Sequence, residues 1–182
     1  LVIPSSDWNG TSVITVIAED EFDFIDTTTF LLTVTPVNDA PSMALPEEFN
    51  VQEDGSLEVD FTSYINDVDG DTFLLLTMSG NSNINVNIES YTVTFSADTN
   101  WNGMEVITFS IDDQNLRTFS SDSVQVNVVP VNDPPVISTL DSLTFDEDNF
   151  DEIILSASDI DGDTSFTFSA SSAEENVQVD VM

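Results

Sequence analysis

Apolar and polar residues alternate with a period of two along short stretches of this chain. Seven stretches show the pattern: Val13–Val16, Phe30–Val34, Leu57–Phe61, Tyr91–Phe95, Val106–Ile111, Val124–Val128 and Val177–Val181. They are rich in Val, Ile, Thr and Phe and are bounded by Asn, Asp, Gly and Pro, which is typical of strands joined by turns. No helical periodicity of useful length competes with them, so the sequence predicts an all-β protein.

Four short signatures occur twice, in the same order and 92 to 94 residues apart. They are Trp8-Asn9-Gly10 with Trp101-Asn102-Gly103, Val37-Asn38-Asp39 with Val131-Asn132-Asp133, Glu53-Asp54 with Glu147-Asp148, and Asp67-Val68-Asp69-Gly70-Asp71 with Asp159-Ile160-Asp161-Gly162-Asp163. A fixed period of this length indicates repeated modules. About seven short strands in each module favour a Greek-key β-sandwich, so we predict tandem sandwich modules.

Two proline-bearing junctions mark the expected module boundaries, at residues 36–41 and 130–135. Proline fixes its own φ and restricts the residue before it, so each junction should be short and stiff. On this division, residues 1–36 are the C-terminal part of one module, residues 37–130 are a complete module, and residues 131–182 are the N-terminal part of another.

The two incomplete pieces would leave apolar strand faces exposed. We expect the chain to be an excerpt from a longer array, which also fits the lack of a basic-then-apolar leader. The alternative is that the front piece of one chain completes the back piece of the next by strand complementation, which would make a self-assembling filament subunit.

The chain carries 35 acidic residues and one basic residue, Arg117, for a formal charge of −34. This field disfavours nucleic acids and anionic membrane surfaces as partners. Because 40% of the residues are apolar, the charge does not imply disorder. Cysteine is absent, which excludes disulfides and thiol chemistry, and no run is long or apolar enough to span a bilayer.

The repeated Asp-x-Asp-Gly-Asp signature places three carboxylates on alternate positions of a turn. Hard cations such as Ca²⁺ take about six to eight oxygen ligands, which carboxylates, carbonyls and water can supply. An EF-hand does not fit, because its twelfth position would be Met78 or Ala170 in place of Glu. Two interpretations without metal stay open: Asp and Asn also form turns, and an acidic surface suits a saline habitat.

Taken in order, the signatures resemble the cadherin-like, bacterial immunoglobulin-like tandem repeats of large bacterial surface adhesins. The resemblance covers the whole chain and adds the late-strand motif Ile107-Thr108-Phe109-Ser110-Ile111-Asp112-Asp113. It implies β-sandwiches strung end to end on the cell surface, with neighbouring copies of the same repeat as partners. It also implies calcium at the junctions between modules.

The calcium ligands that the resemblance implies come from both sides of each junction. At the second junction they are Glu53, Asp54, Asp98, Asn132, Asp133, Asp159, Asp161 and Asp163. At the first they are Asn38, Asp39, Asp67, Asp69 and Asp71, helped by Asp7 or Asp20. Ligands on both sides of a linker would fix the angle between modules, so calcium would make a bendable chain rod-like.

The function predicted from these features is a non-enzymatic extracellular stalk or adhesion segment. A carbohydrate- or protein-binding module is an alternative, with Asn81–Ile84 or Gln114–Phe119 as candidate loops, but it would need an exposed aromatic patch. An enzyme using paired carboxylates is disfavoured, because the acids lie in repeated turns and the chain has no His, Lys or Cys. Trp8 and Trp101 are expected to close the ends of sandwich cores.

Overall fold

The structure is a computed structural model that describes residues 1–71, 75–113, 119–140 and 142–181. Its strands are β1 Gly10–Glu19, β2 Ile25–Val34, β3 Ser42–Met43, β4 Glu48–Gln52, β5 Ser56–Asp60, β6 Ile65–Asn66, β7 Leu75–Ser79, β8 Ile84–Glu89, β9 Thr92–Ala97, β10 Gly103–Asp112, β11 Phe119–Val129, β12 Val136–Ile137 and β13 Ala157–Ser158. Within these ranges the one helical element is the short 3-10 helix η1, Phe61–Tyr64. The all-β prediction is confirmed.

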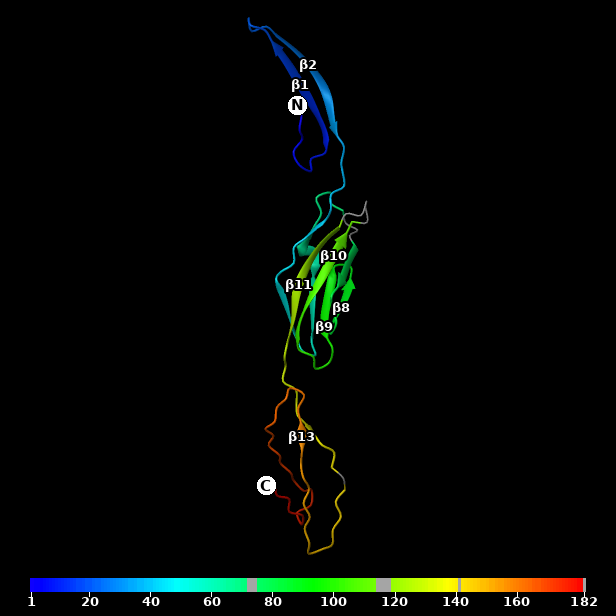
Figure 1. Cartoon of the computed structure of the whole chain (residues 1–182), viewed down its shortest axis with the longest axis vertical. Coiled ribbons are helices and arrows are strands. Elements are labelled where there is room, and N and C mark those ends of the chain that lie inside the picture. The colour runs from blue at the N-terminus through cyan, green and yellow to red at the C-terminus, as the bar shows by residue number, and fades with distance from the viewer. Residues whose placement is uncertain (72–74, 114–118, 141, 182) are drawn as a thin grey trace.

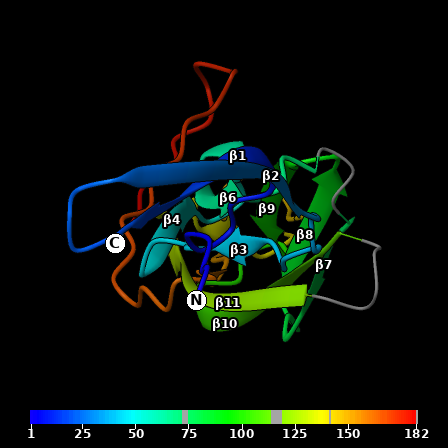
Figure 2. The ribbon, with the colours of Figure 1, turned by 90° about the horizontal axis from the view of Figure 1, so that it is seen from above.

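Two sheets face each other in the middle of the chain (Figures 1 and 2). One has the strand order β4-β11-β10-β7 and the other the order β5-β9-β8, while β3 pairs with β6 beside them. The chain crosses between the sheets after β4, β5, β7 and β9. All the sheet pairings are antiparallel except that of β4 with β11, which is parallel. This is an Ig-like β-sandwich, as the strand pattern predicts.

Alternation along β10 and β11 places one face of each strand in the core. Ile107, Phe109 and Ile111 are fully buried on β10, and Val124 and Val126 are fully buried on β11. The residues between them are only partly buried. Because successive strand side chains point to opposite faces, the period-two pattern of the sequence appears directly as this two-sided burial.

Aromatic rings fill the centre of the sandwich. Phe61 lies edge-on to Phe109 with ring centroids 4.9 Å apart, and Phe49 lies 5.5 Å from Phe95. Tyr64 contacts both Phe49 and Phe61 from the 3-10 helix. Since these rings come from both sheets and from η1, they tie together segments that are distant in sequence.

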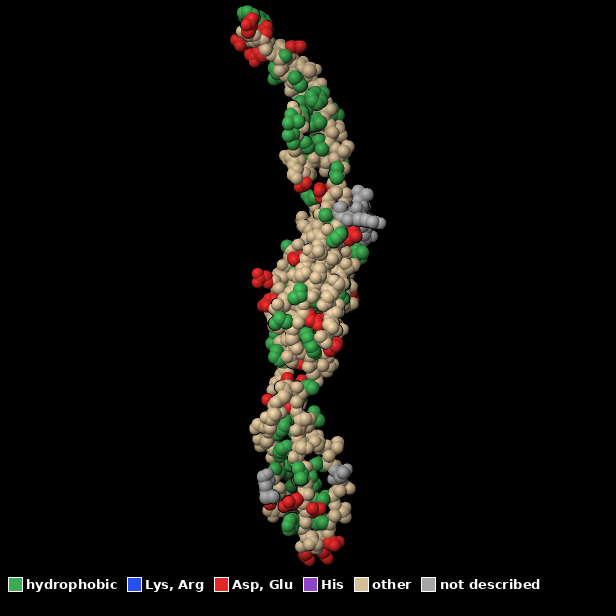
Figure 3. Space-filling model, in the orientation of Figure 1, with side chains coloured by type: hydrophobic (Ala, Val, Ile, Leu, Met, Phe, Trp, Pro, Cys, Tyr) green, Lys and Arg blue, Asp and Glu red, His purple; other side chains and the backbone are tan. Residues whose placement is uncertain are grey.

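The hairpin β1–β2 has the same register as β10–β11. Gly10 is opposite Val34, and Gly103 is opposite Val128. However, β1 and β2 form a two-stranded sheet, and no second sheet covers it in the part of the chain that the structure describes. Many of its apolar side chains are therefore exposed (Figure 3). Val13, for example, is 65% exposed.

Beyond residue 130, the described residues form one short pairing, β12 with β13. The predicted strand Val177–Val181 is wrong, because this stretch pairs with no other strand among the described residues. Its counterpart in the middle sandwich is β8, which pairs with β9. A strand needs a neighbour to satisfy its backbone groups, so an alternating sequence alone does not make one.

The molecule is elongated, with the hairpin at one end, the sandwich in the middle and residues 131–181 at the other end (Figure 1). Narrow connections join these parts at residues 36–41, the first junction, and at residues 130–135, the second junction. The limits 1–36, 37–130 and 131–182 as modules of a tandem array stay a prediction.

Candidate functional site: the acidic junctions

The linker asparagines hold the same local geometry at both junctions. The Asn38 side-chain amide donates to the Asp39 carbonyl at 3.1 Å, and the Asn132 amide donates to the Asp133 carbonyl at 2.9 Å. Each bond folds the asparagine side chain over the next peptide, which is how Asx residues stabilise turns. The turn former and the candidate ligand are therefore the same residue.

A second repeated bond fastens each linker to the acidic turn that follows it. The Asp39 backbone N–H donates to Asp69 Oδ2 at 2.7 Å, and the Asp133 N–H donates to Asp161 Oδ2 at 2.6 Å. A carboxylate accepting a backbone N–H forms a charge-assisted bond, which is short and strong. The structure thus brings the predicted linker residues and the predicted turn residues together at both junctions.

Asp67 organises the first acidic turn through one of its oxygens. Its Oδ1 accepts from the backbone N–H of Asp69 at 2.8 Å, of Gly70 at 3.1 Å and of Asp71 at 3.4 Å. Gly70 has φ +79°, a left-handed conformation that favours glycine. The second turn is similar, since Asp159 Oδ1 accepts from Asp161 N–H at 2.9 Å.

The other oxygen of Asp67 has no such role. Asp67 Oδ2 is buried and has no hydrogen-bond partner in the structure. A buried carboxylate oxygen without a donor or a cation is costly. Turn formation therefore explains Oδ1 of this residue but leaves Oδ2 unexplained.

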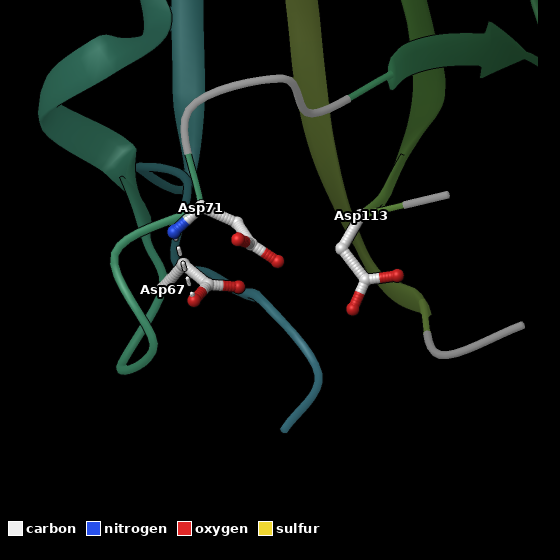
Figure 4. Close-up of side chains that lie close together, drawn as sticks. All are labelled: Asp67, Asp71 and Asp113. Atoms are coloured by element: carbon white, nitrogen blue, oxygen red, sulfur yellow. Dashed lines mark hydrogen bonds between the residues drawn. The ribbon is translucent and has the colours of Figure 1, made fainter. Parts of the chain in front are cut away.

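Three carboxylates converge at the end of the middle sandwich that faces the first junction (Figure 4). One oxygen from each of Asp67, Asp71 and Asp113 lies within 4.8 Å of the others. Asp113 follows β10 and is only 5% exposed, and its Oδ2 accepts from the Asn38 amide at 2.5 Å. Carboxylate oxygens at this spacing fit part of the donor set of a hard cation.

Asp113 was not among the predicted ligands. It lies outside the Asp-x-Asp-Gly-Asp turn in sequence and reaches it only because β10 ends beside that turn. One signal in the sequence could have identified it. An Asp also occupies the corresponding position after the first hairpin strand, at Asp20, 93 residues earlier.

At the second junction, Glu53 is 5% exposed and supports the linker from the sandwich side. Its Oε2 accepts from the Val131 backbone N–H at 3.1 Å, and its carboxylate lies 3.4 Å from the Asn102 amide nitrogen. Val131 begins the Val-Asn-Asp signature of that junction. The buried glutamate therefore links the end of one sandwich to the next linker.

At the second junction, the fold disfavours the ionised form of the Asp133 carboxyl. Burial raises the pKa of its carboxyl, and the negative charges of Asp161, Asp54, Glu53 and Asp159 raise it further. Its Oδ2 is also buried without a hydrogen-bond partner. A raised pKa means that the ionised form is disfavoured in the fold, so stability is lost as pH rises through this pKa. A bound cation would reverse that penalty.

The other three residues predicted at the second junction differ in how close they lie to Asp133. Asp54 accepts from the Asn100 backbone N–H at 3.0 Å, close enough to Asp133 to affect it. Asp163 lines an open hollow together with Asp133. Asp98 is bonded instead to the Asn85 amide at 3.1 Å, and it is not among the charges that act on Asp133.

The two upstream helpers of the first junction are not equivalent. Asp7 has φ +58° in the turn that precedes β1. Asp20 follows β1 and accepts from the Phe22 and Phe24 N–H groups in the hairpin turn. Because β1 and β2 are ten residues long, Asp20 lies roughly 30 Å from the linker that follows Val34. The structure does not bring Asp20 to the first junction.

The first candidate binding loop offers few free backbone donors to a ligand. In the loop Asn81–Ile84, the Ser82, Asn83 and Ile84 N–H groups are turned inward onto Glu105. Of Gln114–Phe119, only Phe119 falls within the described residues, and it is 66% exposed. Trp101 packs against the core as predicted, whereas Trp8 is 41% exposed.

Comparison with protein-family models matches residues 38–129 to the bacterial Ig domain. The chain belongs to this family. Its matched residues are those of the complete sandwich, and bacterial Ig domains are commonly surface-exposed and typically non-enzymatic. The cadherin-like and bacterial Ig-like resemblance of the sequence is confirmed at this level.

Other comparisons add little. Solved structures that resemble the chain include an endo-fucoidan hydrolase, MfFcnA4 from glycoside hydrolase family 107, and a single-residue variant of it. Each shares 17% identity with a TM-score of 0.41, covering 70% of this chain and 20% of the enzyme. This likeness does not establish an activity. No curated protein matches the chain by sequence. Among the described residues, no helix has the length and apolarity to cross a membrane.

Proposed function

We propose that this chain is a non-enzymatic extracellular segment of a bacterial surface protein, in which calcium stiffens the connections between β-sandwich modules. The observation that supports it most is the group of Asp67, Asp71 and Asp113 at the end of the sandwich, with Asp67 Oδ2 buried and unpartnered. Bacterial Ig domains are commonly surface-exposed, which supports the extracellular location.

The arrangement of charge supports a cation in particular. Acidic residues gather at both narrow junctions (Figure 3), within a chain of net charge −34. Like charges brought together by folding repel one another, and a divalent cation between them turns the repulsion into attraction. Calcium would be held by Asp67, Asp71 and Asp113 at the first junction and by Asp133, Asp159 and Glu53 at the second, with Asp161 and Asp54 adjacent.

At the second junction, stiffening would follow from the parts of the chain that supply the ligands. Glu53 belongs to the middle sandwich, Asp133 to the linker and Asp159 to the segment beyond it. A cation that shares ligands from all three would restrict bending of the linker. The role is then mechanical: a stalk that extends outward and spaces an adhesive end from the cell.

Calcium titration with matched variants tests this proposal. In ~0.15 M NaCl, which screens nonspecific attraction, calcium at about 100 times its dissociation constant should stabilise the fold by about 2.7 kcal/mol. The variant Asp113→Asn should lose the part of this gain that comes from the first junction, while Glu58→Gln, which removes the same charge from the exposed face of β5, should keep all of it. Thermal melts and calorimetric titration measure both.

The shape change is measured by small-angle scattering. Chelation should reduce the maximum dimension and broaden the distance distribution, and added calcium should restore both. If Glu58→Gln loses as much of the calcium response as Asp113→Asn, the effect is general charge screening. In that case the proposed sites are wrong.

A further inference from the structure

One pair of strands in the middle sandwich differs from all the others. β4 pairs with β11 in parallel, whereas every other pairing among the described strands is antiparallel. Apart from the two-residue β3, β4 is the first strand after the first junction, and β11 is the last strand before the second junction (Figure 1). The two strands that connect the sandwich to the rest of the chain are therefore bonded directly to each other.

The parallel direction decides how tension along the molecule loads this pair. β11 ends at Val129, next to the second junction, so it runs toward that junction and β4 runs the same way. Tension pulls β4 by its start, toward the first junction, and pulls β11 by its end, toward the second. The two strands must then slide past each other along their length. An antiparallel β4 would instead start beside the end of β11, and tension would peel the two strands apart from that end.

The backbone bonds of this pair continue past both ends of β4. Five residue pairs of β4 and β11 are in register. Before β4, the Glu47 carbonyl accepts from the Gln125 N–H at 3.1 Å, and after β4 the Glu53 N–H donates to the Val129 carbonyl at 2.9 Å. Sliding strains all of these bonds together, whereas peeling strains them one at a time. The pair therefore resists tension along its length as a group of bonds.

Side chains strengthen the same pair. The Asn127 amide of β11 donates to Asn50 Oδ1 of β4 at 2.9 Å. Val51 of β4 is only 2% exposed, so sliding would also displace a side chain packed in the core. Directly after β4, the Glu53 carboxylate accepts from the Val131 N–H at 3.1 Å. This last bond continues the connection from β4 into the second junction.

We propose that β4 and β11 are the load-bearing pair of the middle sandwich, which keeps this module folded when the molecule is stretched between its two junctions. Its biological role rests on the proposed stalk function, since a stalk is stretched when the adhesive end that it carries is pulled away from the cell. Under tension, the lifetime of a fold depends on its unfolding rate and not on its equilibrium stability. Strands that must slide apart slow this step.

Stretching single molecules in two directions tests the load-bearing pair. The chain has no cysteine, so two introduced cysteines define where the handles attach. Thr35→Cys with Pro134→Cys pulls the pair along its length. Ser56→Cys with Pro134→Cys pulls both strands from the same end, because Ser56 begins β5 directly after the turn that follows β4. All three positions are exposed. With a chelator present, we expect the first direction to require an unfolding force several times higher than the second.

Two alanine substitutions on the same face of β11 test which neighbouring strand bears the load. Asn127→Ala removes the bond to β4, and Ser123→Ala removes a bond of the same length, 2.9 Å, to Thr108 of β10. Each should lower stability in urea by a similar amount. Under tension between residues 35 and 134, Asn127→Ala should unfold about fivefold faster than the parent protein, since it loses a bond that must break at the limiting step. Ser123→Ala should unfold at the parent rate.

Equal unfolding forces in the two directions would overturn the proposal, and so would equal acceleration of unfolding by Asn127→Ala and Ser123→Ala. The chelator keeps calcium out of these measurements, so their result is separate from that of the calcium titration. A difference between the two directions supports the load-bearing pair even if calcium has no effect on the shape of the molecule. Equal forces contradict it even if calcium binds as proposed.

Discussion

Residues 37–71 and 131–163 carry the same signatures and share much of their local structure. Pairing of β3 with β6 in the first region recurs as pairing of β12 with β13 in the second. Asp54 and Asp148 both have positive φ, at 55° and 66°. The bond from the linker backbone to the acidic turn is also the same in both regions.

The difference lies in the strands. Residues 48–52 and 56–60 form β4 and β5, whereas the corresponding residues of the second region form no strand. β4 pairs with β11 and β5 pairs with β9, and both partners lie later in the chain. Turns and short pairings are therefore fixed by local sequence, while the longer strands require distant partners.

The largest expected difference between the middle sandwich and residues 131–181 is in the cost of removing a phenylalanine. Phe95→Ala removes a ring that is 0% exposed and contacts three other phenylalanines, so we expect a loss of about 3–5 kcal/mol. Phe145→Ala removes a ring that is 53% exposed, and we expect a change within about 0.5 kcal/mol. Urea unfolding measures both.

Similar costs at the two positions would contradict the comparison, because they would mean that residues 131–181 also hold a packed core. The test is specific, since the two substitutions delete the same side chain.

Much of the sandwich could be predicted from sequence because alternation is a local signal. Leu57–Phe61, Tyr91–Phe95 and Val124–Val128 were predicted as strands and overlap β5, β9 and β11. Val177–Val181 alternates equally well and failed. Periodicity reports which face of a strand could be buried, but the strand also depends on a partner that no window of sequence contains.

A smaller effect is expected at Glu105. Its carboxylate accepts several hydrogen bonds from a neighbouring turn, and the β1–β2 hairpin has no such carboxylate at the corresponding position. Burial alone would raise the pKa of Glu105, but bonds from the Asn83, Ser82 and Ile84 N–H groups and the Asn83 amide lower it overall. The corresponding residue of β1 is Ser12. Glu105→Gln should therefore cost about 1–2 kcal/mol, since it weakens charge-assisted bonds to a turn that is only partly buried.

The pH dependence follows from the sign of this shift. A lowered pKa means that the ionised form stabilises the fold; the contribution is complete above the usual value of 4.5 and is lost as pH falls through the lower folded value. Stability measured from pH 7 to pH 3 should fall less steeply in Glu105→Gln than in wild type. Glu58→Gln is the control, and an identical slope in all three proteins would rule out this role for Glu105.

The junction chemistry could be predicted in part. Asn38, Asp39, Asp67, Asp69 and Asp71 are close in sequence or joined by a repeated motif, and the structure brings them together. Two other predictions depended on tertiary placement. Asp113 was not predicted because β10 carries it to the turn from a distant part of the chain. Asp98 was predicted as a ligand, and in the structure its carboxylate accepts from the Asn85 amide.

The smallest expected effect concerns the two tryptophans, which share a turn but not an environment. Asp7 and Asn100 have φ of 58° and 56° ahead of Trp8 and Trp101. Trp101 packs on the core and also over Gly103, where an added Cβ would lie 2.9 Å from the ring, whereas Trp8 is 41% exposed.

Trp101→Phe should cost less than about 1.5 kcal/mol, and Trp8→Phe still less. Fluorescence separates them more clearly: the Trp8→Phe protein, which reports Trp101, should emit at shorter wavelength and be quenched less by acrylamide than the Trp101→Phe protein. Equal quenching would mean that both rings are equally exposed to solvent. The local turn would then determine the exposure of each ring, and packing of Trp101 on the sandwich core would not reduce it.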